Sequence, residues 1–190
     1  MSSDNALESA DLLVMQQVTG FLSNDFALED AEGRPVAYGH TLGSTAERMF
    51  GGNRQFEITD RSGTPLFHVH DPMTWGRDRY RVTDPQGGPI ADLVQRMTFL
   101  RTSVQVSVVD GTELVLDGNL MGMDFQLTAG GTAVATVNRR WAGLGQAMLG
   151  RSRYALSLDP GMPPLVRCAV IGSVIALDLI RAKQSRRNND

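Results

Sequence analysis

The sequence predicts a mainly β protein: a closed antiparallel barrel of twelve strands that encloses one apolar C-terminal α-helix. Two observations lead to this fold class. A hairpin pattern recurs six times along the chain, and the chain then changes to an apolar segment without strand alternation. Because the open edges of an antiparallel sheet invite aggregation, we expect the strands to close around that segment.

The hairpin pattern is clearest in three segments that share an aromatic residue, an aliphatic residue, Asp, Gly and a second aliphatic residue at equal spacing. Side chains alternate between the two faces of a strand, so the aromatic and the first aliphatic residue share a face. Asp and Gly suit the first and last positions of a type I turn. The three segments are "FALEDAEGRPV" from Phe26, "FEITDRSGTPL" from Phe56 and "YRVTDPQGGPI" from Tyr80.

Three weaker copies of the pattern follow and complete the six hairpins. They are "VQVSVVDGTELVL", "FQLTAGGTAVATV" and "YALSLDPGMPPLV". The Asp-x-x-Gly string also occurs in GTPases, but those proteins need a glycine-rich loop that ends in Gly-Lys, and no Gly here precedes Lys. Hairpin turns therefore explain the string better than a nucleotide switch does.

Composition indicates one globular domain with a substantial core, since 42% of the 190 residues are hydrophobic and 21% are charged. A net charge of -3 gives no general attraction to nucleic acid. The lone Cys168 cannot form an internal disulfide, which fits a reducing compartment. The acidic start lacks the pattern of a secretory signal, so we expect a cytoplasmic protein. We divide the chain into an acidic tail (1–11), one barrel domain (12–183) and a basic tail (184–190).

The final element begins near Val166, where "VRCAVIGSVIALDLIRAK" is apolar on nearly every side of a helical projection. Its uncharged run between Arg167 and Asp178 spans roughly 15 Å, about half of a bilayer's hydrocarbon core. We therefore predict a helix in the core of the barrel, with membrane insertion as the less favoured alternative.

One face of this helix carries the small residues Cys168, Gly172 and Ala176, which recur every four positions. Such a face lets a barrel wall approach the helix backbone closely, and in a membrane it would pack against another helix. Asp178 lies near the helix C-terminus, where an acid meets an unfavourable dipole. We interpret it as a structural anchor rather than a catalytic acid.

Two basic segments are candidates for contact with anionic lipid headgroups. One is "RRWAGLGQAMLGRSR", in which Trp141 is flanked by arginines, and the other is "RAKQSRRNND" at the end of the chain. The alternatives are a cap on the barrel mouth and a solvated tail. The candidate membrane-contact residues are Arg139, Arg140, Trp141, Arg151, Arg153, Arg181 and Lys183.

Four segments resemble the phospholipid scramblases and the LURP-one-related proteins, which share the tubby-like fold. They occur in the family's order and, with the hairpins between them, cover roughly residues 12 to 183. The segments are "LVMQQV", "NRQFEITDRSGTPLFHVHDP", "MDFQLTAGGTAVATVNRRWAGL" and "VRCAVIGSVIALDLI". The resemblance implies a twelve-stranded barrel around the C-terminal helix. It also implies a membrane-linked role, such as phospholipid binding or translocation, and a peripheral position at the inner face of the plasma membrane.

Two family features are missing. Where the animal scramblases carry an acidic calcium-binding segment, this chain has Gly150, Arg151, Ser152 and Arg153. Calcium prefers several oxygen ligands and would be repelled by the two arginines. The cysteine clusters that take palmitate are absent as well. We therefore expect a calcium-independent protein without a lipid anchor.

Other chemistry has weak support in the sequence. His68 and His70 share one strand face and could seed a metal site if His40 or another ligand joined them. A polar outward strand face explains the pair more simply, so we predict no metal and no cofactor. No catalytic constellation stands out, and we expect no enzymatic activity.

Two hypotheses remain: a phospholipid-binding or phospholipid-translocating protein, and a soluble barrel that acts as a scaffold or binds a small apolar ligand. Protein partners stay unknown.

Overall fold

A computed structural model describes residues 6–16, 25–43, 54–72, 79–98, 101–119, 124–138 and 153–187. These residues form twelve strands, one short helix and one long helix. The elements are α1 (Ala6–Ser9), β1 (Leu12–Gln16), β2 (Phe26–Glu29), β3 (Pro35–Leu42), β4 (Arg54–Asp60), β5 (Pro65–Asp71), β6 (Arg79–Thr83), β7 (Pro89–Thr98), β8 (Arg101–Val108), β9 (Glu113–Asn119), β10 (Asp124–Ala129), β11 (Thr132–Asn138), β12 (Arg153–Leu158) and α4 (Pro164–Arg187).

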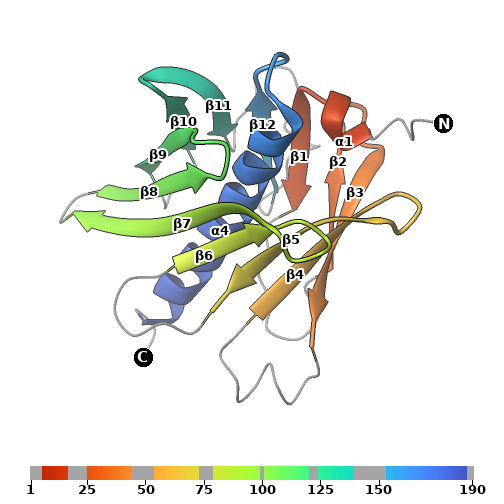
Figure 1. Ribbon diagram of the computed structural model, residues 1–190, viewed down its shortest axis with the longest axis horizontal. Coiled ribbons are helices and arrows are strands. Elements are labelled where there is room, and N and C mark those ends of the chain that lie inside the picture. Colours follow the sequence, from red (N-terminus) through yellow and green to blue (C-terminus); the bar gives the residue numbers. More distant parts are fainter. Residues whose placement is uncertain are drawn as a thin grey trace.

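The strands form a closed barrel in which each strand pairs antiparallel with its sequence neighbours, and β1 pairs with β12 to complete the ring. Helix α4 runs through the space that the strands surround (Figure 1). The predicted fold class, a closed twelve-stranded barrel around one C-terminal helix, is confirmed.

The repeated Asp and Gly residues form the hairpin turns as their pattern predicts. In the β4–β5 turn, Oδ1 of Asp60 accepts hydrogen bonds from the backbone N–H groups of Ser62 (2.8 Å) and Thr64 (2.9 Å). Gly63 donates its N–H to the carbonyl oxygen of Asp60 at 3.1 Å and has a φ of 83°. Only glycine adopts that backbone conformation without steric cost. Asp30 and Asp84 accept equivalent bonds in the β2–β3 and β6–β7 turns.

The sixth predicted hairpin is wrong. After β12 the chain turns at Asp159 and enters α4 at Pro164 instead of returning as a strand. Pro163 and Pro164 have no N–H to donate to a strand ladder, whereas proline suits the first turn of a helix. The twelfth strand is supplied by β1, which pairs with β12 from Leu12↔Ser157 to Gln16↔Arg153.

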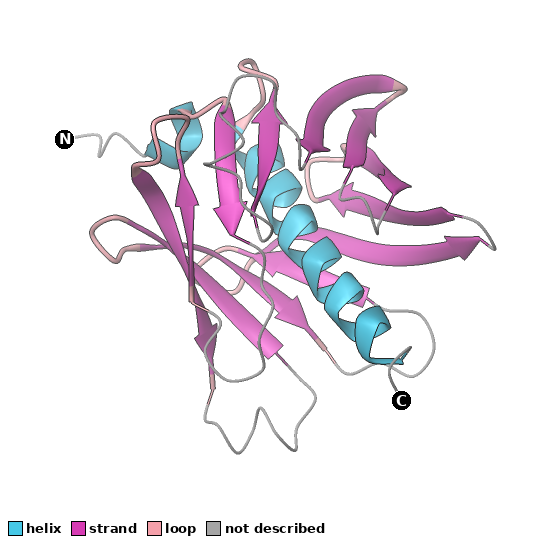
Figure 2. Cartoon of the chain, turned by 180° about the vertical axis from the view of Figure 1, so that it is seen from behind, coloured by secondary structure: helices cyan, strands magenta, loops and turns pink. Residues whose placement is uncertain are grey.

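The alternating strand directions give the barrel two different ends. The turns after β2, β4, β6, β8, β10 and β12 share one end, which we call the turn end, and α4 begins there. At the opposite end, β11 finishes at Asn138 and β12 starts at Arg153. Figure 2 shows α4 running from beside the short helix α1 to the opposite end, where the C-terminus lies.

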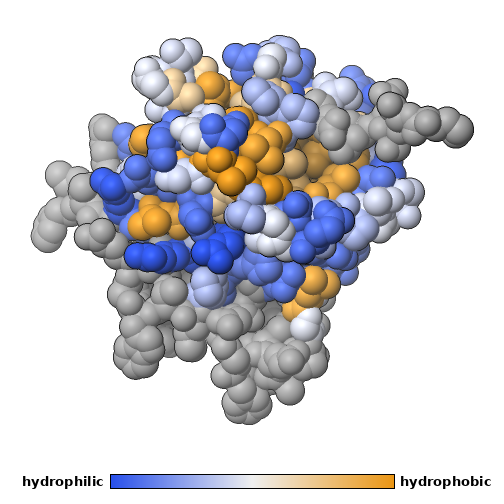
Figure 3. Space-filling model, in the orientation of Figure 1, coloured by the Kyte–Doolittle hydropathy of each residue, from blue (hydrophilic) through white to orange (hydrophobic). Residues whose placement is uncertain are grey.

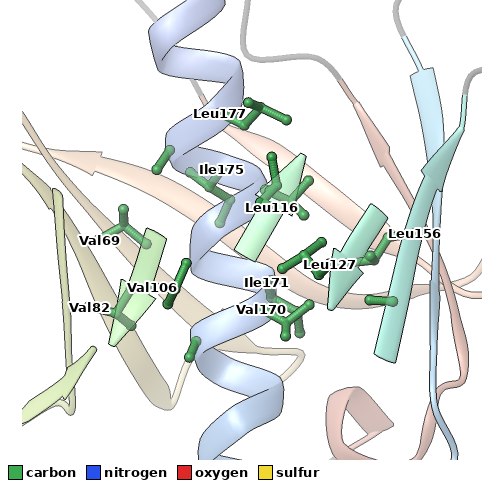
Figure 4. Close-up of a cluster of buried hydrophobic side chains, with 14 of the residues drawn as sticks. Val69, Val82, Val106, Leu116, Leu127, Leu156, Val170, Ile171, Ile175 and Leu177 are labelled. Carbon is green, nitrogen blue, oxygen red and sulfur yellow. The ribbon is translucent and has the colours of Figure 1, made fainter. Parts of the chain in front are cut away.

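The core lies between α4 and the inner faces of the strands. Every residue of α4 from Ala169 to Ile180 is buried. Figure 4 shows Val69 and Val82 on one side of the helix and Leu127 and Leu156 on the other. The helix therefore contacts the wall on several sides, as its apolar composition predicts. Among the described helices, none is long and apolar enough to cross a membrane.

Candidate functional site

Arg153 is the one candidate membrane-contact residue whose side chain the structure describes. It opens β12, and its Nη1 donates to Oε2 of Glu29 on β2 at 3.1 Å. The Arg153 side chain is 38% exposed and that of Glu29 is 19% exposed. An ion pair within the barrel wall therefore already offsets part of the charge of Arg153.

The other candidate membrane-contact residues are placed less completely. Arg139, Arg140, Trp141 and Arg151 lie outside the described residues, as do Gly150 and Ser152 of the stretch that replaces the acidic calcium segment. Arg181 and Lys183 belong to the last turns of α4, and only their backbone is described. The strand ends that flank residues 139–152 and the C-terminal end of α4 all lie at the end opposite the turns.

His68 and His70 lie on β5 and bond to neighbours on opposite sides. Nε2 of His68 lies 3.1 Å from Oε2 of Glu57 on β4, and Nε2 of His70 lies 3.0 Å from Oγ1 of Thr83 on β6. The ring planes are tilted by 69°, with centroids 6.1 Å apart. Burial lowers the pKa of His70, and the charges of His68 and Arg81 lower it further.

His40, the suggested third metal ligand, lies across Glu57 from His68. In register, His40 on β3 pairs with Glu57, and Glu57 pairs with His68. Nδ1 of His40 instead lies 3.4 Å from Oδ2 of Asp25. Within the described parts of the chain, no three His, Cys, Asp or Glu side chains come together in a way that could hold a metal ion.

The four residues singled out on the C-terminal helix differ in burial. Cys168 is partly buried, whereas Gly172, Ala176 and Asp178 are buried. A Cβ added to Gly172 would lie 2.5 Å from Cγ2 of Val82 and 3.6 Å from Cγ2 of Val69. The helix backbone therefore lies directly against β5 and β6 at Gly172.

Arg167 forms a buried site that the sequence did not reveal. Its side chain is 3% exposed, and its Nη1 donates to the carbonyl oxygens of Ala10 and, at 3.4 Å, Leu7. Nη2 lies 3.5 Å from Oδ1 of Asp11, whose side chain is 52% exposed. From the sequence, Arg167 marked only the charged boundary of an apolar run. The available signal was an arginine in the first turn of an otherwise apolar helix.

A pocket of about 140 Å³ lies beside Arg167 at the turn end. Helix α1, the start of β5 and the first turns of α4 line it. Its lining residues are Leu7, Pro65, Leu66, Pro164, Arg167, Cys168 and Ile171. Figure 3 shows hydrophobic side chains at the surface in the same upper part of the molecule, near the start of α4. The site thus combines an apolar lining with a buried guanidinium.

Comparisons with known proteins agree with this architecture. A crystal structure of a protein from Arabidopsis thaliana is similar, with a TM-score of 0.54 and 18% sequence identity, over 95% of this chain and 98% of that one. At this identity the likeness extends to the fold alone. No curated protein matches the chain. The family model described as LURP-one-related matches residues 10–178, which is most of the barrel. The chain therefore belongs to the LURP-one-related family.

Proposed function

We propose that this protein binds phospholipid membranes peripherally, through the barrel end opposite the turns and without calcium. The observation that supports the proposal most is the position of the described elements next to the two basic segments. The strand ends flanking residues 139–152 lie at the same end of the barrel as the basic C-terminal end of α4. Cations grouped at one end add their attractions to an anionic surface, each contributing about 1 kcal/mol.

The burial of α4 favours surface contact over insertion. The apolar residues from Ala169 to Ile180 are buried within the barrel, so inserting them into a bilayer would require the barrel to open. Attraction through cations and an interfacial tryptophan needs no such change. Translocation of phospholipid between leaflets is the stronger form of the proposal. It rests on the resemblance to scramblases, and therefore needs its own assay.

The test is flotation of the purified protein with liposomes of neutral phosphatidylcholine alone or with anionic phosphatidylserine. We expect binding to the anionic vesicles that weakens as salt rises, because mobile ions screen surface charges. Millimolar calcium should neither be needed for binding nor shift the melting temperature. Failure to float at low and at physiological salt would contradict the proposal and favour a soluble scaffold or ligand-binding role.

A charge-matched pair of variants tests which end of the barrel binds. The double substitution Arg139→Gln with Arg140→Gln should weaken partitioning about tenfold or more, at about 1 kcal/mol per cation. The control replaces Arg34, which is 69% exposed in the β2–β3 turn, and Arg81, which is 60% exposed on β6, by Gln. This control variant removes two positive charges as well, but from outside the proposed docking segment. Equal weakening by both variants would show attraction to net charge alone and would contradict a specific docking end.

A translocation assay follows only if the vesicles are bound. Fluorescent lipid in the inner leaflet should become accessible to a membrane-impermeant quencher faster when the protein is present, with or without calcium. Binding without faster exchange would limit the function to phospholipid binding.

A further inference from the structure

We propose that the pocket at the start of α4 binds a small organic monocarboxylate, with the acid group on Arg167 and the apolar body against the pocket lining. The inference is independent of membrane binding, because the pocket lies at the turn end and the proposed membrane contact lies at the opposite end. It assigns a ligand class to a site that the charge and hairpin patterns of the sequence did not indicate.

The unused hydrogen-bonding capacity of Arg167 is the first reason. Nε of Arg167 is buried and has no hydrogen-bond partner among the described residues, although the guanidinium is charged and can donate five hydrogen bonds. A buried donor without an acceptor is costly, and the cost is greater for a charged group. A carboxylate in the pocket beside Arg167 would supply an acceptor for the guanidinium once a small side-chain movement turned Nε toward the pocket.

The charge balance around Arg167 is the second reason. Its Nη1 bonds to two backbone carbonyl oxygens, which carry no net charge. The one carboxylate within ion-pair distance in the described structure is that of Asp11, at 3.5 Å, and it is about half exposed. The start of a helix also favours negative charge, since its first backbone N–H groups have no partner within the helix. Both effects favour an anion in the pocket.

The rest of the lining selects the kind of anion. Leu7, Leu66 and Ile171 contribute hydrocarbon, and Pro65 and Pro164 have no N–H to donate. A phosphate dianion would lose hydration on every side and gain one cation, whereas a monocarboxylate has one charged end and an apolar remainder. A cavity of about 150 Å³ in another protein accommodates benzene, so the 140 Å³ here fits an acid of about that size.

The first experiment titrates the protein, labelled at leucine and isoleucine methyl groups, with benzoate and, separately, with benzamide. Benzamide has the same ring without the charge. We expect saturable shifts at Leu7, Leu66 and Ile171 with benzoate, and about tenfold weaker binding of benzamide, because a hydrogen bond to a charged group is lost. Inorganic phosphate at the same ionic strength should not compete. Equal binding of benzoate and benzamide, or no shift at these methyl groups, would overturn the inference.

Two variants test the site from different sides. Arg167→Met keeps a long apolar chain and removes the charge, so it should weaken benzoate about tenfold while leaving benzamide within about twofold. Leu66→Trp fills the pocket from β5 while keeping Arg167 in the chain and should abolish binding of both compounds. Its matched control is Val115→Trp, at a 42% exposed position on β9. If Arg167→Met fails to fold, the comparison of Leu66→Trp with Val115→Trp decides, and benzoate binding retained in Leu66→Trp would contradict the site.

Discussion

At the scale of single residues, Gly172 shows how closely the helix and the wall approach each other. A Cβ at this position would lie 2.5 Å from Cγ2 of Val82, well inside normal van der Waals contact. Overpacking of this kind costs typically about 1 to 3 kcal/mol. In a helix that nothing touches, however, Ala is favoured over Gly by about 1 kcal/mol.

We therefore predict that the effect of Gly172→Ala changes sign with its neighbour. In the wild-type background it should lower the free energy of unfolding, because the new methyl group meets Val82. In a Val82→Ala background it should raise the free energy of unfolding by about 1 kcal/mol, because the space is then available and helix propensity decides. Urea denaturation of the four proteins measures this cycle. The same effect in both backgrounds would mean that Val82 does not restrict this position.

A second residue-scale prediction concerns the pH dependence of stability at His70. Burial, with the neighbouring charges of His68 and Arg81, lowers the pKa of His70 in the folded protein. As the pH falls through about 6.5, the unfolded chain takes up the proton first. The contribution of His70 to the free energy of unfolding is therefore fully present above pH 6.5. It is lost as the pH falls toward the lowered pKa of His70 in the folded protein.

Substitution of His70 should reduce this acid sensitivity. His70→Gln keeps a polar group near Oγ1 of Thr83, which lies 3.0 Å from His70 Nε2, but it cannot titrate. We expect the melting temperature of the variant to fall less than that of the wild type between about pH 7 and pH 5. Measurements near pH 8, where the ring is neutral in both states, separate the loss of packing from the loss of titration. Parallel curves for the two proteins would contradict the assignment.

At the scale of elements, α1 is fixed to the first turn of α4 by hydrogen bonds. Leu7 is 2% exposed and belongs to the main core, while Arg167 donates to the carbonyl oxygens of Leu7 and Ala10. The acidic N-terminal segment thus contributes a core side chain as well as charge. Two hydrogen bonds from Arg167, each to a residue more than 150 positions away in the sequence, hold this segment against the turn end.

The packing of α1 gives an element-scale prediction. Leu7→Ala should lower the free energy of unfolding by about 2 kcal/mol, the lower part of the range for a buried leucine, because a short terminal helix can adjust. Ser9→Ala, at an exposed position of the same helix, is the matched control. Urea denaturation measures both variants. A Leu7→Ala protein as stable as the control would show that α1 adds nothing to the fold in solution.

At the scale of the whole molecule, stability depends on closure through β1. This strand pairs with β12 over its whole length and with β2 at Val14↔Glu29 and Met15↔Leu28. Because β1 has a neighbour on each side, the N–H of a central residue faces another strand. Without β1, the long edge of β12 would be open to association with other molecules.

Proline substitution in β1 tests closure. Val14→Pro removes a ladder hydrogen bond in the middle of the strand and should lower the melting temperature strongly, with larger species on size-exclusion chromatography. Leu12→Pro, at the first residue of the strand, is the control, because proline is tolerated at that position. Similar melting temperatures for the two variants would mean that β1 is not essential to closure.

The sequence by itself determined the local features of this protein. The Asp and Gly of the repeated hairpins act within five residues of each other, and the helix is visible as a change of period. The sixth hairpin failed because two consecutive prolines, Pro163 and Pro164, follow its turn and suit the start of a helix rather than a returning strand. The candidate membrane segment from Arg139 to Arg153 stays a prediction, since all of it except Arg153 lies outside the described residues.

Only the tertiary structure decided which distant groups meet. The pairing of β1 with β12 and the contacts of Arg167 with the N-terminal segment join opposite ends of the chain. No local pattern encodes them, because they depend on how the ring of strands closes and where α4 enters it. The pairing of β5 with β4 and β6 places His68 and His70 beside different strands, and the packing of α1 and α4 against the start of β5 forms the pocket at the turn end. The hairpins and the helix thus follow from short-range sequence chemistry, while both candidate binding ends follow from barrel geometry.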